Sequence, residues 1–174
     1  MPLIDYRNAR PTVESDVWTH VGDGETLPPD RPATISLERW KAARRDMVGR
    51  NQPLGVRLDS HERIDEILPD LSRFALITLN FPNLNDGRHY TTARLLRERH
   101  GFGGRLRATG QVQHDQLDPL RRCGFDEFEL PSGKSAASAI SAFGEISVAY
   151  QPAADARPTA ALLRRRLPEQ AVAV

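Results

Sequence analysis

The sequence predicts an α/β fold, in which repeated β-α units form a single domain around a parallel sheet of four to five strands. Apolar runs typical of strands alternate with helical patterns, with about twenty to thirty residues in each unit. The clearest run, FALITLNF at 74–81, is continuously apolar, as expected of a strand covered on both faces. A chain of 174 residues also suits one domain. Such short units fit either an open sheet or a partial βα barrel, and the sequence leaves both open.

The chain divides into an arm, a domain and a tail. Residues 1–32 are polar and interrupted by proline and glycine, which predicts an N-terminal arm or a short edge hairpin. The α/β domain is expected over 33–152 and opens with Ser36, a good N-cap for a helix over 37–48. The tail, 153–174, is rich in Ala and Arg, and is compatible with a short basic helix or with a frayed end.

The remaining elements of the domain follow from the alternation of patterns. Strands are expected at 54–59, 74–81, 104–110, 126–131 and 147–152, and the helices between them at 61–71, 90–101, 113–124 and 135–146. Parallel strands joined by helices imply right-handed crossovers.

Composition argues against several function classes. The formal net charge is +1, which argues against bulk attraction to nucleic acid or to a membrane surface. Cys123 is the only cysteine, which excludes a disulfide within the chain and a cysteine-based metal site built by one subunit. No apolar segment resembles a signal peptide core or a membrane span, so the cytoplasm is the expected location.

The sequence also lacks the motifs of common cofactor sites. The five histidines show no metal-ligand spacing, so no metal is predicted. GKS at 133–135 imitates the end of a phosphate-binding loop, but Phe128 stands where the first glycine is required. No flavin, nicotinamide or iron–sulfur motif occurs, so no cofactor is predicted.

Binding groups are expected in the loops at the carboxyl ends of the strands. In NDGRHYTTAR, the turn Asp86-Gly87 places Arg88 beside the start of a helix, where unpaired N–H groups favour an anion. The guanidinium group adds a fork that suits an oxyanion or a carboxylate. The alternative is a structural Asp86–Arg88 network that pins the loop.

The segment GRLRATG gives a second candidate. Strand alternation puts Arg105, Arg107 and Thr109 on one face, and a buried arginine needs a carboxylate or a ligand. Asp115 and Glu129 are the carboxylates expected to pair with Arg107, and a structural salt bridge is favoured over a ligand. We expect the guanidinium groups of Arg88 and Arg107 to converge near neighbouring strand tips. The candidate anion-binding or substrate-binding residues are Asp86, Gly87, Arg88, Tyr90, Arg107, Thr109, Asp115 and Gln116.

The same segments, FPNLNDGRHYTTARLLRERHGFGGRLRATGQVQHDQL at 81–117 and RRCGFDEFEL at 121–130, resemble a bacterial family known as domain of unknown function 934. The resemblance covers about residues 33–150 and leaves the arm and the tail outside. Arg105 departs from the pattern, which has a glutamate there. The motifs that carry the resemblance are Phe81-Pro82, Asp86-Gly87-Arg88, Tyr90, Ala93–Arg97, Leu106–Ala108, Asp115-Gln116 and Cys123–Asp126.

Members of that family are often described as oxidoreductases involved in sulfite reduction, although no catalytic residue accompanies the description. The resemblance therefore implies an accessory protein of assimilatory sulfite reduction that binds sulfite reductase or a small oxyanion. The six arginines against one glutamate between 88 and 107 fit an anionic ligand. Two alternatives stay open. One is an enzyme that clamps a small anionic substrate with Arg88 and Arg107 and uses Asp86 or Asp115 as base; the other is a non-catalytic scaffold.

Overall fold

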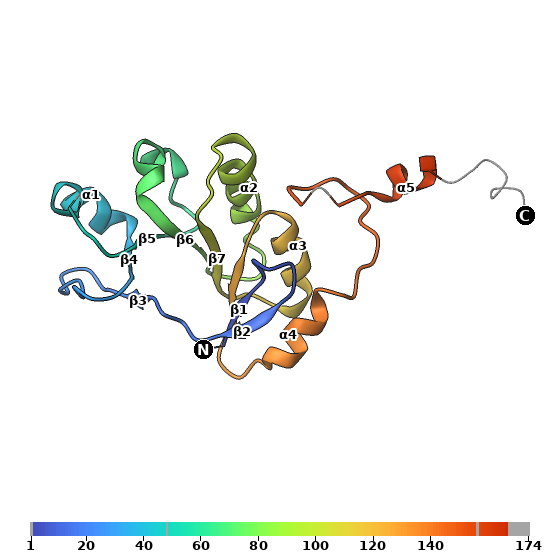
Figure 1. Cartoon of the computed structure of the whole chain (residues 1–174), viewed down its shortest axis with the longest axis horizontal. Helices are drawn as coiled ribbons and strands as arrows, with labels where there is room; N and C mark the ends of the chain where they lie inside the picture. Colours follow the sequence, from blue (N-terminus) through green and yellow to red (C-terminus); the bar gives the residue numbers. More distant parts are fainter. Residues whose placement is uncertain (1, 48, 156, 167–174) are drawn as a thin grey trace, which may run out of the picture.

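A computed structural model of the chain describes residues 2–47, 49–155 and 157–166. In this part of the chain, eight strands form one open sheet in the order β2-β1-β8-β7-β6-β5-β4-β3, curved as a half-barrel (Figure 1). Strands β3 to β8 run parallel, whereas β1 is antiparallel to both β2 and β8. The α/β class is confirmed, but the sheet has more strands than the expected four to five and a mixed orientation.

The strands are β1 (Leu3–Asp5), β2 (Thr12–Glu14), β3 (Thr19–His20), β4 (Ala33–Ser36), β5 (Leu54–Leu58), β6 (Phe74–Phe81), β7 (Arg105–Gly110) and β8 (Glu127–Glu129). The α-helices are α1 (Leu37–Met47), α2 (Arg88–Arg94), α3 (Leu117–Arg122), α4 (Ala136–Ala142) and α5 (Ala160–Arg166). Shorter elements are the 3-10 helices η1 (Ile64–Glu66), η2 (Leu68–Arg73) and η4 (His114–Gln116), and a π-helical turn, η3 (Leu95–Arg99), that continues α2. Among these described helices, none is both long and apolar enough to cross a membrane.

Helices cover one face of the sheet, which we call the outer face. In Figure 1, α1, α2 and α3 lie above the strands, while the segment between β2 and β3 runs below them. Aromatic side chains fill the space beneath the helices: Trp40 of α1 meets the ring of Phe74 edge-on at 4.8 Å, and Phe143 contacts Phe128 of β8. Apolar side chains from both layers are buried together, so the hydrophobic core lies on this face.

The opposite, inner face of the sheet is polar. The strand registers align Ser36, Arg57, Thr78, Arg107, Glu127 and Asp5 in one row across six strands. No helix covers this row in the described part of the chain, and the N-terminal arm crosses it (Figure 1). The expectation that β6 is apolar on both sides is therefore wrong at Thr78, which faces inward.

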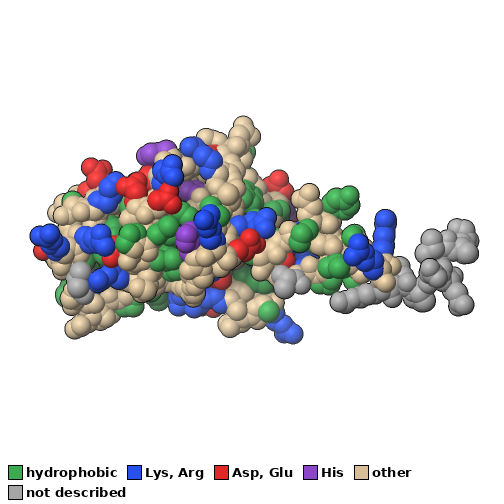
Figure 2. Space-filling model, turned by 90° about the horizontal axis from the view of Figure 1, so that it is seen from above, with side chains coloured by type: hydrophobic (Ala, Val, Ile, Leu, Met, Phe, Trp, Pro, Cys, Tyr) green, Lys and Arg blue, Asp and Glu red, His purple; other side chains and the backbone are tan. Residues whose placement is uncertain are grey.

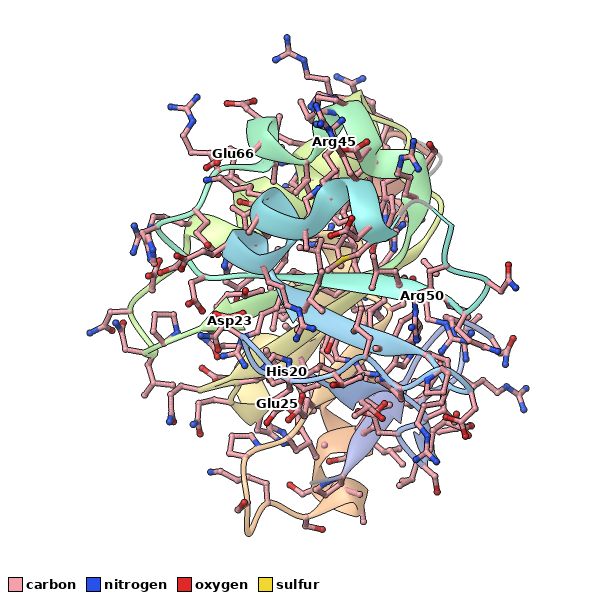
Figure 3. All side chains as sticks on the ribbon, turned by 90° about the vertical axis from the view of Figure 1, so that its left-hand side faces the viewer. His20, Asp23, Glu25, Arg45, Arg50 and Glu66 are labelled. Carbon is pink, nitrogen blue, oxygen red and sulfur yellow. The ribbon has the colours of Figure 1, made fainter. Side chains whose placement is uncertain are left out.

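The outer surface mixes both signs of charge. Figure 2 shows lysine and arginine side chains interspersed with aspartate and glutamate over the helices, in agreement with the small net charge. Seen from the β3 edge, Arg45 and Glu66 lie on the helical side, whereas His20 and Glu25 of the arm lie on the other side (Figure 3). The charged groups that matter for a site are therefore those that the sheet and the arm bring together.

Several expected elements differ from the structure. The arm forms the predicted hairpin, β1–β2, but it also supplies β3, and β4 precedes the helix that Ser36 caps through its hydroxyl oxygen, which accepts from the N–H of Arg39. The expected helix at 61–71 is split into η1 and η2, with Pro69 in the first turn of η2. The expected strand at 147–152 is wrong: Ala149 makes one isolated bridge to Thr159.

Candidate anion-binding sites

Arg88 ties together the loops that follow β5 and β6. Its Nε donates to Asp86 at 2.9 Å, and its Nη2 donates to Asp86 at 2.6 Å and to the Ser60 hydroxyl oxygen at 2.9 Å. Hydrogen bonds from Arg88 and from Ser60 hold the pKa of Asp86 well below its ordinary value. The Asp86–Arg88 network proposed as the structural alternative is therefore present, and it orients a guanidinium group that is 60% exposed.

A hollow of about 560 Å³ opens beside Arg88 on the outer face. Its apolar floor comes from Ile64, Leu68 and Leu95. Polar side chains around it are those of Ser60, His61, Glu62, Arg63, Asp65, Arg88, Thr92, Arg99 and His100. Arg63 pairs with Asp65 and Arg88 pairs with Asp86, each at 2.6 Å, so Arg99 is the arginine of this lining that makes no ion pair with a described residue. The Glu62 carboxylate lines the same space.

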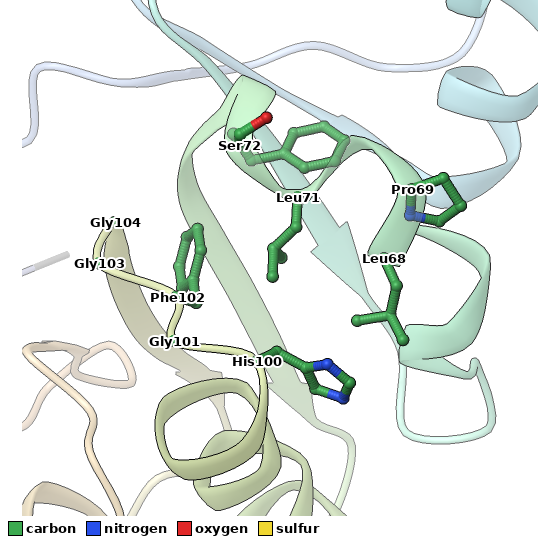
Figure 4. Close-up of a pocket in the computed structure, with 10 residues that line it drawn as sticks. Leu68, Pro69, Leu71, Ser72, His100, Gly101, Phe102, Gly103 and Gly104 are labelled. Carbon is green, nitrogen blue, oxygen red and sulfur yellow. The ribbon is translucent and has the colours of Figure 1, made fainter.

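A second hollow, of about 540 Å³, shares Leu68 and His100 with the first and continues along η2 (Figure 4). In Figure 4, Leu71 and Phe102 point into it from opposite walls, and the backbone of 101–104 forms one edge. Because no Lys, Arg, Asp or Glu lines it, this second hollow extends the hollow beside Arg88 without adding formal charge.

The neighbours of Arg88 at the start of α2 are held by packing. Gly87 is the N-cap residue, and Tyr90 packs edge-on against Phe81 at 5.8 Å. Burial raises the pKa of Tyr90 to about 12, so its phenol keeps its proton at neutral pH. His89 is buried beside Phe81, and neither of its ring nitrogens has a hydrogen-bond partner in the described residues.

Arg107 lies on the inner face, in ion pairs. Its Nε donates to Glu127 at 2.9 Å, and its Nη1 and Nη2 donate to the two carboxylate oxygens of Asp16 at 2.6 and 2.9 Å. Burial alone would lower the pKa of Arg107, but the two carboxylates outweigh it and raise the pKa. The expected salt bridge is confirmed, whereas the expected partners, Asp115 and Glu129, are wrong.

The partners differ because register, and not strand alternation, decides which side chains meet. Arg107 stands opposite Glu127 across β7 and β8. Glu129, two residues further on, accepts the hydroxyl of Thr109 at 3.0 Å. Asp115 is exposed in η4, beyond the end of β7.

The structure does not bring Arg88 and Arg107 together. They share no hydrogen-bond or ion-pair partner in the described residues: Arg107 is held toward β8 and the arm, and Arg88 toward Ser60 after β5. Arg107 also lies three residues before β7 ends at Gly110, on the face without helices. The single anion site expected from the sequence is therefore two separate centres.

A third polar group, not predicted from the sequence, joins His114 of η4 to Ser138 of α4 and to Glu145, which follows that helix. His114 Nε2 lies 2.8 Å from Glu145, and His114 Nδ1 lies 3.4 Å from the Ser138 hydroxyl. The side chain of Gln116 accepts from the N–H of Gln113 in a capping box. No pattern in the sequence joins these residues, because 31 positions separate His114 from Glu145. No cluster of three or more potential metal ligands occurs in the described chain.

Most of the arginine-rich run is neutralised. The five arginines that pair with carboxylates are Arg88 with Asp86, Arg94 with Glu98, Arg97 with Asp126, Arg105 with Glu127, and Arg107 with Asp16 and Glu127. Arg99 makes no ion pair with any described residue. The run therefore acts mainly as a set of structural contacts.

Fold and site together define an α/β half-barrel protein with guanidinium groups on both faces of its sheet. A family model described as "Bacterial protein of unknown function (DUF934)" matches residues 55–161, and the chain belongs to that family. No curated protein matches the chain. The matched region contains Arg88, Arg107 and Glu127, whereas Asp16 lies outside it.

Proposed function

We propose that this chain is an accessory protein of assimilatory sulfite reduction that binds a small oxyanion beside Arg88. The observation that supports the proposal is the placement of an exposed, oriented guanidinium group at the mouth of a hollow of about 560 Å³. Membership of the family is shown by the family model, which is described as one of unknown function. The link to sulfite reduction comes only from the resemblance stated in the sequence analysis. The partner would be sulfite reductase.

The chemistry of the Arg88 centre suits a small anion. Asp86 and Ser60 occupy the Nε and Nη2 groups of the fork, which fixes its direction, while Nη1 has no partner in the described residues. The start of α2 adds little to this centre, because the N–H of Arg88 already donates to Asp86 at 3.3 Å and the N–H of Tyr90 to the Gly87 carbonyl oxygen at 3.1 Å. Arg99 lines the same hollow and makes no ion pair with any described residue, and the carboxylates of Glu62 and Asp65 line that hollow as well. A small oxyanion between Arg88 and Arg99 would be bound by charge-assisted hydrogen bonds.

The enzyme alternative loses one of its two candidate bases. Because hydrogen bonds from Arg88 keep the pKa of Asp86 low, this carboxylate is a weak proton acceptor. Asp115 remains, but Arg107 is committed to Asp16 and Glu127 and offers no clamp beside it. These contacts therefore favour the accessory role over catalysis at the carboxyl edge of the sheet, because catalysis would need both a base and a second arginine that is free to bind the substrate.

A ligand screen tests the proposed site. Sulfite, sulfate, phosphate and nucleotides are added separately, and the unfolding midpoint is measured. A ligand at a hundred times its dissociation constant stabilises the protein by about 2.7 kcal/mol. We expect sulfite or sulfate to raise the midpoint, and Arg88→Ala to remove the rise. Arg94→Ala is the matched control, because Arg94 lies on the same helix and pairs with Glu98 outside the hollow.

A genetic experiment tests the proposed role. A strain that lacks this gene and any paralogue should fail to grow on sulfate and should recover with sulfide, because the step that it supports lies between sulfite and sulfide. The Arg88→Ala variant should restore growth poorly. Normal growth of the deletion strain on sulfate would contradict the proposed role in sulfite reduction. If, in addition, no anion raised the unfolding midpoint, the proposed binding site beside Arg88 would be contradicted as well.

A further inference from the structure

The arm lies on the inner face as a strap, residues 15–18, between β2 and β3. These four residues make no backbone hydrogen bond to the rest of the described chain. Val17 is 60% exposed, so the strap is not held by apolar burial at that position. Its main polar anchor is the carboxylate of Asp16 on Arg107. The ion pair with Arg107 is thus the main polar attachment of the strap, and the side chain of Trp18 is half-buried.

That ion pair has the geometry of a ligand contact. The two terminal nitrogens of Arg107 face the two oxygens of Asp16 at 2.6 and 2.9 Å, as a guanidinium fork holds a free carboxylate. Arg107 itself is 4% exposed and is fixed from behind by Glu127. The side chain of Asp16 is 35% exposed, so solvent reaches it from the open side. Arg107 is therefore held in a fixed position, whereas the carboxylate that it binds can be reached by solvent.

The charges under the strap need one further negative charge. Glu127 bonds both Arg105, at 3.0 Å, and Arg107, so two guanidinium groups face one carboxylate. If Asp16 left, the cluster would keep a net positive charge in a largely buried place, which is costly. One monoanion would restore the balance, whereas a dianion would leave an excess of negative charge.

The strap also leaves a polar group without a partner. Trp18 Nε1 is buried and has no hydrogen-bond acceptor in the described residues. An unmet buried donor costs free energy in the closed state. Movement of the strap would return this N–H to water, and this gain offsets part of the cost of exposing the half-buried Trp18 ring.

We propose that Asp16 is a displaceable internal occupant of an anion site, and that the strap at 15–18 moves aside when a small monocarboxylate takes its place on Arg107. The ligand class is a monoanion with two coplanar oxygens, because the fork of Arg107 presents two parallel donors. This site is separate from the Arg88 centre and does not depend on the function proposed for it.

Chemical rescue tests the occupant role of Asp16. Asp16→Ala should lower the unfolding midpoint, and formate should restore most of the loss, whereas sulfate should restore little. The rescue should disappear in Asp16→Ala combined with Arg107→Lys, because lysine lacks the fork. Asp23→Ala is the matched control: Asp23 lies on the same arm and accepts the Ser36 hydroxyl at 2.6 Å. Equal rescue of Asp23→Ala, or no rescue of Asp16→Ala, overturns the proposal.

Displacement is tested in the unaltered protein. The backbone N–H of Trp18 donates to the Asp16 carboxylate at 3.0 Å, so its hydrogen exchange reports the closed strap. Formate should speed exchange at Trp18 at least about ten-fold, whereas Trp40 in the core should stay protected. Binding of formate with unchanged exchange at Trp18 would mean that the strap does not move, and the proposal would fail.

Discussion

Arg107 joins Glu127, on the adjacent strand, to Asp16, which lies 91 residues away in the chain. This three-residue contact closes the N-terminal arm over the inner face of the half-barrel. It uses an arginine inside a strand, which is expensive to bury unless it is paired. The contact therefore links the stability of the sheet to the position of the arm.

Removing the buried carboxylate of Glu127 should show how much these ion pairs contribute to the stability of the protein. Glu127→Ala leaves Arg105 and Arg107 without their shared partner, and breaking a buried pair in this way costs about 3–5 kcal/mol. Glu129→Ala, two residues along the same strand, removes a neutral hydroxyl contact and should cost about 1 kcal/mol. Urea denaturation measures both. Equal losses would show that the ion pairs contribute no more than an ordinary hydrogen bond.

His89 should make the protein less stable in acid. Burial lowers the pKa of this imidazole to about 4, whereas an unfolded histidine titrates near 6.5. Between these values the unfolded state binds the proton first, so stability is complete above about pH 6.5 and falls as the pH drops toward 4. The loss approaches about 3 kcal/mol at the lower end. Unfolding free energies measured across this range should show it.

Two variants isolate the source of that pH dependence. His89→Phe keeps a ring against Phe81 and removes the titrating group, so the slope of stability against pH should flatten. His61→Gln changes an exposed histidine and should leave the slope intact. A slope that survives His89→Phe would assign the effect to other groups.

Arg97 should be a structural residue and not a ligand contact. It donates to the carbonyl oxygens of Phe102, Gly104 and Gly124, and it pairs with Asp126. Arg97→Ala leaves these acceptors unpaired and should cost about 2–4 kcal/mol. Arg97→Lys should recover little, because an ammonium group cannot span them. Thermal unfolding measures both, and full stability of the lysine variant would contradict the account.

Replacement of Gly124 should also destabilise the protein, because this glycine packs against Arg97. Its φ of +103° is strained for other residues, and an added Cβ would lie 2.5 Å from the Cγ atom of Arg97. Gly124→Ala should therefore displace Arg97 and cost at least about 1 kcal/mol. Gly133→Ala is the comparison: its φ is also positive, at +84°, but its added Cβ meets nothing within 4 Å. If Gly124→Ala lowered the free energy of unfolding less than Gly133→Ala in the same unfolding assay, the prediction would be contradicted.

Cys123 should react slowly in the folded protein. Burial raises the pKa of its thiol, and the nearby arginines Arg94 and Arg122 offset this only in part. Because the thiolate is the reactive form, labelling by an aromatic disulfide should be at least about ten-fold slower in buffer than in denaturant. Fast labelling under native conditions would point to a reactive thiol instead.

The central β-α units could be read from the sequence because each has its own periodicity. The mainly apolar run at 74–81 is strand β6, and Ser36 caps α1 as expected. The short strands β3 and β4 carry too few residues for a periodic signal. They form because β5 offers a paired edge, which no local pattern reveals.

The candidate site was predictable only in part, because contacts between distant segments leave no local pattern in the sequence. The need of Arg107 for a carboxylate follows from its place in a strand. Its partners depend on the register of β8 against β7 and on the path of the arm, which set Glu127 and Asp16 beside it. Arg88 and Asp86 are two residues apart, so their pairing was visible in the sequence, but the direction of the fork toward Ser60 was not.

The separation of the two guanidinium centres is the claim that most needs testing. A spectrum of the arginine Nε–H groups of labelled protein resolves Arg88 and Arg107, and single substitutions assign them. Sulfite is added at alkaline pH, where it is a dianion, and formate is added in a second titration. We expect sulfite to shift the Arg88 signal alone and formate to shift the Arg107 signal. Joint movement of both signals with the same ligand and the same midpoint would contradict two independent sites.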